Sequence, residues 1–174
     1  MLENCFYQLT HLPLLDKKST ILELARSTFV EPEKEIKGVY TSRTSKAKST
    51  FENTRFVQDL GKEFGTVKSY FVKFTAMTVY DWHCDVDRHC TINFLLSNSP
   101  KATTLFREPI SRLVYNIIEC PYTMCQPVLF NTTIPHCVVN LNPTTRFMLS
   151  LDFKLGVKFN SVKEFLFDYK TESY

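Results

Sequence analysis

Two histidines and one aspartate are placed in this chain so that they can meet around a metal ion. His83 and Asp85 are separated by Cys84, and His136 lies much further along the chain. Side chains alternate between the two faces of a β-strand, so His83 and Asp85 point the same way and Cys84 points away. A second strand that carries His136 would complete the set. The sequence therefore predicts a metal site made of His83, Asp85 and His136.

This donor set indicates one kind of metal chemistry. Two imidazole nitrogens and one carboxylate oxygen occupy one face of an octahedral metal and leave the opposite positions open, an arrangement typical of non-haem Fe(II) oxygenases. Arg146 follows His136 by ten positions. Its planar, permanently charged guanidinium can bind a carboxylate through two parallel hydrogen bonds. We therefore expect Arg146 to fix a dicarboxylate co-substrate beside the metal.

The elements that must position these residues read as short strands. Apolar and polar residues alternate from Val67 to Phe74, and proline-containing turns separate the runs that follow. About eight short strands at intervals of about 8–12 residues favour a sandwich or barrel, and the jelly roll is the eight-stranded case. His83 ends one run, His136 begins another and Arg146 lies on a third. The further predicted strands are 79–84, 89–96, 101–107, 112–118, 122–125, 128–131, 137–141 and 145–153.

Helices are predicted on both sides of this β-rich segment. The apolar spacing indicates a helix over 16–27 with Asp16 or Ser19 as N-cap, and a second over 55–64 that stops at Gly65. Asn160 or Ser161 would begin a last helix that runs to Tyr169. We expect one domain over 1–174, with 1–66 as helical N-terminal support after an extended entry strand, 67–153 as the β core and 154–174 as the C-terminal helix.

Two predicted strands place polar groups on interior faces. Arg146, Ser150 and Asp152 share a face of the last strand with Met148, and Asn93 is the polar group of its strand best placed to reach inward. Buried charges and amides need partners, which a bound dicarboxylate would supply. The structural alternatives are histidines bonded to the backbone and an ion pair from Arg146 to Asp152 or Glu119.

Composition narrows the choice of function. The 174 residues suffice for one domain with a real core, and a net charge of +3 is too small to indicate nucleic-acid binding by itself. No apolar run has the roughly 20 residues that span a bilayer, and the first residues lack a signal-peptide pattern. We expect a cytoplasmic protein whose six cysteines are reduced thiols. The basic stretch 41–50 is either a solvated loop or a lid or arm for an anionic substrate.

Three segments resemble the 2-oxoglutarate/Fe(II)-dependent oxygenase superfamily. They are Trp82-His83-Cys84-Asp85, Ile134-Pro135-His136-Cys137-Val138 and Arg146-Phe147-Met148-Leu149-Ser150. The likeness covers about 67–153 and is greatest to small prolyl- and aspartyl-hydroxylase-like members, including those of phages. It implies a mainly β fold with flanking helices, the double-stranded β-helix (jelly roll, cupin-like).

The resemblance also implies roles for individual residues. His83, Asp85 and His136 would hold Fe(II), Arg146 would bind the distal carboxylate of 2-oxoglutarate, and Asn93 would contact the co-substrate. Some branches carry Ser two positions after the arginine, where this chain has Met148, so Ser150 is the next hydroxyl on that face. Tyr80 and Tyr115 are candidates for the tyrosine that several prolyl hydroxylases use on the same carboxylate.

The implied reaction is hydroxylation of a C–H bond, in which 2-oxoglutarate and O2 give succinate and CO2, with ascorbate as a candidate reductant. The expected partners are 2-oxoglutarate and a primary substrate, with a peptide prolyl, asparaginyl or aspartyl side chain favoured over nucleic acid, and no membrane. Two alternatives remain open. One is a jelly-roll module that binds a ligand without turnover, and the other is a cupin-type metalloenzyme, although only four histidines are present.

Overall fold

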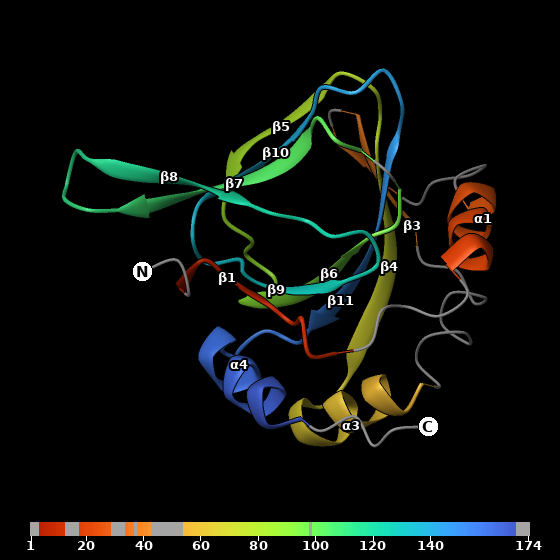
Figure 1. Ribbon diagram of the computed structural model, residues 1–174. Helices are drawn as coiled ribbons and strands as arrows, with labels where there is room; N and C mark the ends of the chain where they lie inside the picture. Colours follow the sequence, from red (N-terminus) through yellow and green to blue (C-terminus); the bar gives the residue numbers. More distant parts are fainter. Residues whose placement is uncertain are drawn as a thin grey trace.

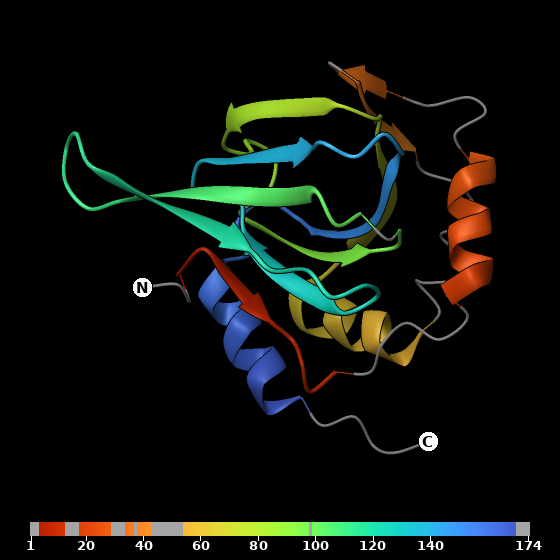
Figure 2. The ribbon, with the colours of Figure 1, turned by 45° about the horizontal axis from the view of Figure 1, so that its top comes forward.

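Two antiparallel sheets form the body of the protein (Figures 1 and 2). This computed structural model describes residues 4–12, 18–28, 34–36, 38–42, 54–97 and 99–169. The larger sheet has the order β1 (Phe6–Gln8), β9 (Pro127–Asn131), β6 (Cys90–Leu95), β11 (Arg146–Phe153), β4 (Val67–Phe74), β3 (Val39–Ser42) and β2 (Lys34–Ile36). The smaller sheet has the order β5 (Thr78–His83), β10 (His136–Asn140), β7 (Ala102–Pro109) and β8 (Tyr115–Cys120).

The outer face of the larger sheet is covered by helices. In Figure 1, α3 (Arg55–Phe64) and α4 (Phe159–Asp168) lie below β9, β6 and β11, and α1 (Lys18–Thr28) lies beside β3 and β4. Leu60 of α3 and Leu166 of α4 are fully buried in one apolar cluster with Leu149 of β11. Because β11 alternates, Met148, Ser150 and Asp152 face the other way, toward the smaller sheet. Nearly all residues of β6 and β11 are buried, and the inward face carries polar side chains such as Asn93, Ser150 and Asp152.

The helices lie where the sequence predicts them, but predicted N-caps are wrong, and Ser19 lies inside α1 rather than before it. The helix over 55–64 is confirmed, with Thr54 accepting the N–H of Val57 and Gly65 ending it at φ 81°. The predicted N-caps Asn160 and Ser161 are wrong, because α4 begins at Phe159 after Lys158, which makes no side-chain cap hydrogen bond. α1 lies within two residues of the prediction, and Asp16 lies outside the described residues.

The strands differ from the sequence in three places. The predicted strand 122–125 is wrong, since Met124 makes only an isolated bridge to Leu95. β8 begins at Tyr115 rather than at 112, because the hairpin turn is closed by the N–H of Ile110 on the carbonyl of Val114. β2 and β3 were not predicted, whereas β1 matches the expected entry strand. Positions 43–50 of the basic stretch lie outside the described residues.

Among the described residues, no helix combines the length and apolarity needed to cross a membrane.

Candidate metal centre

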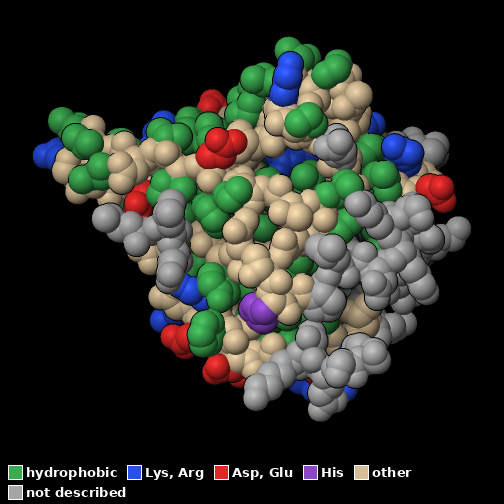
Figure 3. Space-filling view, viewed as in Figure 1, with side chains coloured by type: hydrophobic (Ala, Val, Ile, Leu, Met, Phe, Trp, Pro, Cys, Tyr) green, Lys and Arg blue, Asp and Glu red, His purple; other side chains and the backbone are tan. Residues whose placement is uncertain are grey.

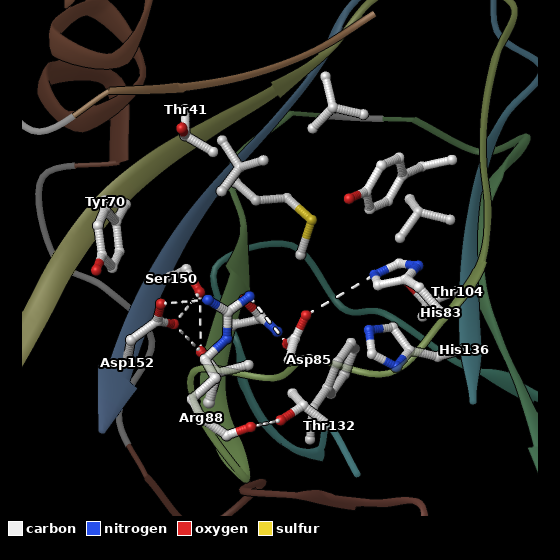
Figure 4. A pocket seen from close by; sticks show the side chains of 18 of the residues that line it. Thr41, Tyr70, His83, Asp85, Arg88, Thr104, Thr132, His136, Ser150 and Asp152 are labelled. Carbon is white, nitrogen blue, oxygen red and sulfur yellow. Dashed lines mark hydrogen bonds and ion pairs between the residues drawn. The ribbon is translucent and has the colours of Figure 1, made fainter. Parts of the chain in front are cut away.

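The structure brings His83, Asp85 and His136 together. His83 ends β5 and His136 begins β10, where the two are register partners with ring centroids 4.3 Å apart. Asp85 follows β5, and one ligand atom from each of the three residues lies within 4.8 Å of the others. The three side chains converge on a cavity of about 490 Å³ between the two sheets (Figure 4). The expected proximity of the triad is therefore found.

A β-bulge aims His83 into this cavity. The register between β5 and β10 shifts between His136 and Val138, which pair with His83 and Tyr80. Tyr80 and His83 both line the cavity, although plain alternation would place residues three apart on opposite faces. The extra residue re-aims the side chains, as bulges beside active sites commonly do. Asp85 lies beyond the strand end, where its N–H donates to the carbonyl of Thr132 at 3.0 Å, so a pinned loop rather than strand alternation turns it inward.

Both imidazoles are held in the form that binds metal. The Nδ1 atoms of His83 and His136 lie 2.7 and 2.9 Å from the backbone carbonyls of Asp81 and Ile134. A carbonyl can only accept, so each Nδ1 carries a proton and each Nε2 is the ring atom left to bind a metal. Burial lowers the pKa of His136 to about 4. Its ring is therefore neutral near pH 7, and the backbone bonds fix ring orientation as they do for metal-ligating histidines.

Arg88 connects the triad to a second buried carboxylate. Its Nη2 lies 2.9 Å from Asp85 Oδ2 and its Nη1 2.7 Å from Asp152 Oδ2. Asp152 Oδ1 accepts from Thr91 at 2.7 Å and Ser150 at 3.0 Å (Figure 4). Burial is the largest influence on both carboxyls and raises the pKa of each, and the Arg88 charge opposes that rise. Arg88 lies three residues after Asp85, and its side chain forms part of the cavity wall.

Arg146 is fully buried at the start of β11. Its Nη1 donates to the carbonyl of Thr103 at 3.2 Å, and its Cζ lies 4.6 Å from the Tyr122 ring centroid. Within the described residues, its Nε and Nη2 have no hydrogen-bond partner. The alternative ion pairs to Asp152 and Glu119 are not formed in that part of the chain, and Asp152 is bonded to Arg88 instead. Two N–H groups of a buried cation thus remain for an acceptor from outside the chain.

Of the other candidate residues, three line the cavity and Tyr115 does not. Asn93 and Ser150 line the cavity and pair across β6 and β11, but the Ser150 hydroxyl is bonded to Thr91 and Asp152 rather than directed at Arg146. Tyr80 lines the cavity with its ring 4.3 Å from that of His83. Tyr115 lies on the exposed hairpin beside Arg107.

Tyr122 was missed by the sequence reading. It lines the cavity, stacks on Arg146 and shares a 3.0 Å hydrogen bond with Thr104. Burial raises its pKa above the ordinary tyrosine value, so its hydroxyl stays protonated. The only signal in the sequence is its place after Pro121, which marks a turn and not a site.

No protein-family model matches the sequence, and no curated protein matches it significantly. Solved structures do match the fold. A prolyl hydroxylase from Trichoplax adhaerens, in complex with a hypoxia inducible factor peptide fragment, superimposes with a TM-score of 0.64 at 12% identity, over 96% of this chain and 88% of that one. A prolyl-4-hydroxylase from Pseudomonas putida gives 0.59 at 17% identity, over 87% and 93%.

HygX from Streptomyces hygroscopicus, crystallised with nickel, 2-oxoglutarate and hygromycin B, gives a TM-score of 0.61 at 9% identity, over 89% of this chain and 85% of that one. At these identities the likeness establishes the fold. The protein has the double-stranded β-helix of the 2-oxoglutarate/Fe(II) oxygenases, which confirms the fold class that the resemblance implied.

Proposed function

We propose that the protein is a single-domain Fe(II)- and 2-oxoglutarate-dependent dioxygenase in which His83, Asp85 and His136 hold the iron. The observation that carries this proposal is the convergence of two imidazoles and one carboxylate, with one ligand atom from each within 4.8 Å of the others, in a cavity on an oxygenase fold. Two imidazoles and one carboxylate form a donor set suited to non-haem Fe(II). Backbone carbonyls preset both rings.

The residues around Arg146 fit the distal carboxylate of 2-oxoglutarate. The free Nε and Nη2 offer two donors on a rigid guanidinium, and the neighbouring Tyr122 hydroxyl can supply a third. Formal charge supports the same assignment. The carboxylates of the partly buried Asp85 and the buried Asp152 balance the guanidiniums of Arg88 and Arg146. A divalent metal and a dicarboxylate together add no net charge to this interior, so their joint binding avoids a large desolvation penalty.

The chain's contribution to the reaction is binding and orientation. Bound Fe(II) with 2-oxoglutarate and O2 supplies the oxidising chemistry, which yields succinate, CO2 and a hydroxylated product, with ascorbate as a reductant for the iron. Arg146 anchors one end of the co-substrate, and the triad fixes the reacting end. Val72, Phe74 and Met148 give part of the cavity an apolar wall.

For the primary substrate we propose a peptide prolyl, asparaginyl or aspartyl side chain. The Trichoplax neighbour was solved with a peptide fragment. In this chain the β7–β8 hairpin protrudes from the body of the protein and carries exposed apolar side chains, among them Ile110, Leu113 and Ile117, that offer a surface to a polypeptide (Figures 1 and 3). A phage-type origin of this small oxygenase remains part of the proposal.

The test is an aerobic incubation of the protein with Fe(II), ascorbate and 2-oxoglutarate, followed by measurement of succinate. Oxygenases of this class turn over slowly without primary substrate, so wild type should form succinate and the His136→Ala variant should not. Absence of succinate together with absence of metal binding would favour the ligand-binding module. Metal-dependent turnover that needs no 2-oxoglutarate would favour the cupin-type metalloenzyme.

A further inference from the structure

Asp85 is held through only one of its two oxygens. Oδ2 contacts Arg88 at 2.9 Å, whereas Oδ1 lies 3.9 Å from the Nε2 of His83 (Figure 4). The carboxylate therefore turns a single oxygen toward the two imidazoles. No cation other than Arg88 touches Asp85 among the described residues.

Arg88 is itself fixed on the far side. Its Nη1 lies 2.7 Å from Asp152 Oδ2, and Asp152 Oδ1 is bonded to the Thr91 and Ser150 hydroxyls, so all four groups of this network hold one another. The Arg88 backbone is also fixed, because its carbonyl accepts from the Thr132 hydroxyl at 3.0 Å. The contact with Asp152 is a hydrogen bond and the contact with Asp85 is an ion pair. The two contacts use separate nitrogens of one planar guanidinium, which the point charge of a lysine cannot reproduce.

We propose that Arg88, anchored by Asp152, is a positioning residue that restricts Asp85 to one metal-binding oxygen. This inference rests on the proposed function. An octahedral metal that accepts three protein atoms, a chelating 2-oxoglutarate and O2 has no further position. If Asp85 could offer both oxygens, its second oxygen would compete with the co-substrate. Arg88 prevents that competition by engaging Oδ2.

If Arg88 acts through Asp85, its loss should affect the affinity for 2-oxoglutarate and not the affinity for the metal. Loss of a merely structural residue would weaken both. In Arg88→Met, Asp85 gains a free oxygen and loses a neighbouring cation, so Co(II) affinity should stay within about threefold of wild type or become tighter. The affinity of the Co(II)-loaded protein for 2-oxoglutarate should fall by about tenfold or more. Arg88→Lys keeps the charge but lacks the fork, so it should recover only part of that loss.

The experiment is anaerobic calorimetric titration of each protein first with Co(II) and then with 2-oxoglutarate. Arg107→Met is the matched control, because Arg107 stacks on Trp82 and Tyr115 outside the cavity, and it should match wild type in both titrations. Should Arg88→Met fail to fold, Arg88→Met with Asp152→Asn removes both members of the buried pair together. The amide can still accept from Thr91 and Ser150, and the double variant should show the same loss of 2-oxoglutarate affinity.

The outcomes separate this inference from the proposed function. A wild-type protein that binds neither Co(II) nor 2-oxoglutarate would overturn both. If wild type binds both, three results for the variants overturn the role of Arg88 alone: unchanged 2-oxoglutarate affinity, a proportionate loss of both affinities, or complete recovery in Arg88→Lys.

Discussion

Arg146 and Asp152 lie on the same face of β11 with opposite charges, yet they do not pair. Asp152 is bonded to Arg88, Thr91 and Ser150, while Arg146 keeps two buried N–H groups without a partner in the described part of the chain. An unpaired buried donor costs about 1–3 kcal/mol, and more when the group is charged. The protein thus tolerates an unsatisfied cation at the position where the proposed co-substrate needs one.

Replacing Arg146 should weaken the binding of 2-oxoglutarate without lowering the stability of the protein. In Arg146→Met we expect the melting temperature without ligands to equal or exceed that of wild type, because an apolar chain replaces an unpaired buried charge. The metal should still bind, while 2-oxoglutarate binding to the Co(II)-loaded protein should weaken by about 2–5 kcal/mol. Calorimetry and thermal unfolding measure both. Unchanged co-substrate affinity would move the carboxylate site elsewhere in the cavity.

Removing any member of the triad should abolish metal binding. His83→Ala, Asp85→Ala and His136→Ala each leave two ligands, and two ligands rarely hold Fe(II) against water. His89→Ala is the control, since His89 does not line the cavity and alanine keeps the backbone carbonyl that accepts the N–H of Thr132. Equilibrium dialysis with Fe(II) under argon should give one ion per wild-type or His89→Ala chain. Stoichiometric iron in a triad variant would refute the ligand assignment.

The buried His136 should make the metal-free protein sensitive to mild acid. Its folded pKa of about 4 lies below the ordinary value of 6.5, so between these values the unfolded chain binds a proton that the folded chain does not. The contribution of His136 to stability is therefore fully present above about pH 6.5 and is lost as pH drops toward 4, by about 3 kcal/mol in total. The raised pKa values of Asp85 and Asp152 act in the opposite direction, so the comparison of wild type with a His136 variant isolates this contribution. Urea unfolding in EDTA from pH 7.5 to 4.5 should show this slope in wild type. His136→Asn should lose most of it, and an equally steep slope there would assign the acid sensitivity to other groups.

The core of the larger sheet gives a prediction that does not depend on function. Leu149 is fully buried between β11 and the covering helices, whereas Leu155 is mostly exposed. Leu149→Ala should lower the free energy of unfolding by about 2–5 kcal/mol through lost burial and the cavity left behind. Leu155→Ala should change it by less than about 0.5 kcal/mol. Equal effects at the two positions would contradict the packing described here.

Much of this architecture was accessible from local sequence pattern. The helix over 55–64 has a cap at each end and a clear apolar stripe, so its bounds follow from Thr54 and Gly65. Prolines marked the starts of β9 and β10 correctly. The same punctuation wrongly predicted a strand at 122–125, and the start of β8 was misplaced, because both depend on backbone hydrogen bonds of turns that the sequence pattern does not reveal.

The candidate site, too, was predictable from the sequence only in part. The H-x-D spacing and a distant histidine and arginine are visible in the sequence, and the structure brings the triad together. The Arg88–Asp152 contact joins residues 64 positions apart, and Tyr122 reaches Arg146 from a turn without periodicity. Such long-range pairs carry no local signature, since only the sheet register decides them.

The most direct test is anomalous diffraction from crystals grown with Mn(II), a stand-in for Fe(II), and 2-oxoglutarate without O2. We predict one metal peak bound by His83 Nε2, Asp85 Oδ1 and His136 Nε2, with the distal carboxylate of 2-oxoglutarate on Arg146. A metal peak elsewhere, or a cavity that binds 2-oxoglutarate with no metal between the two histidines, would contradict the account.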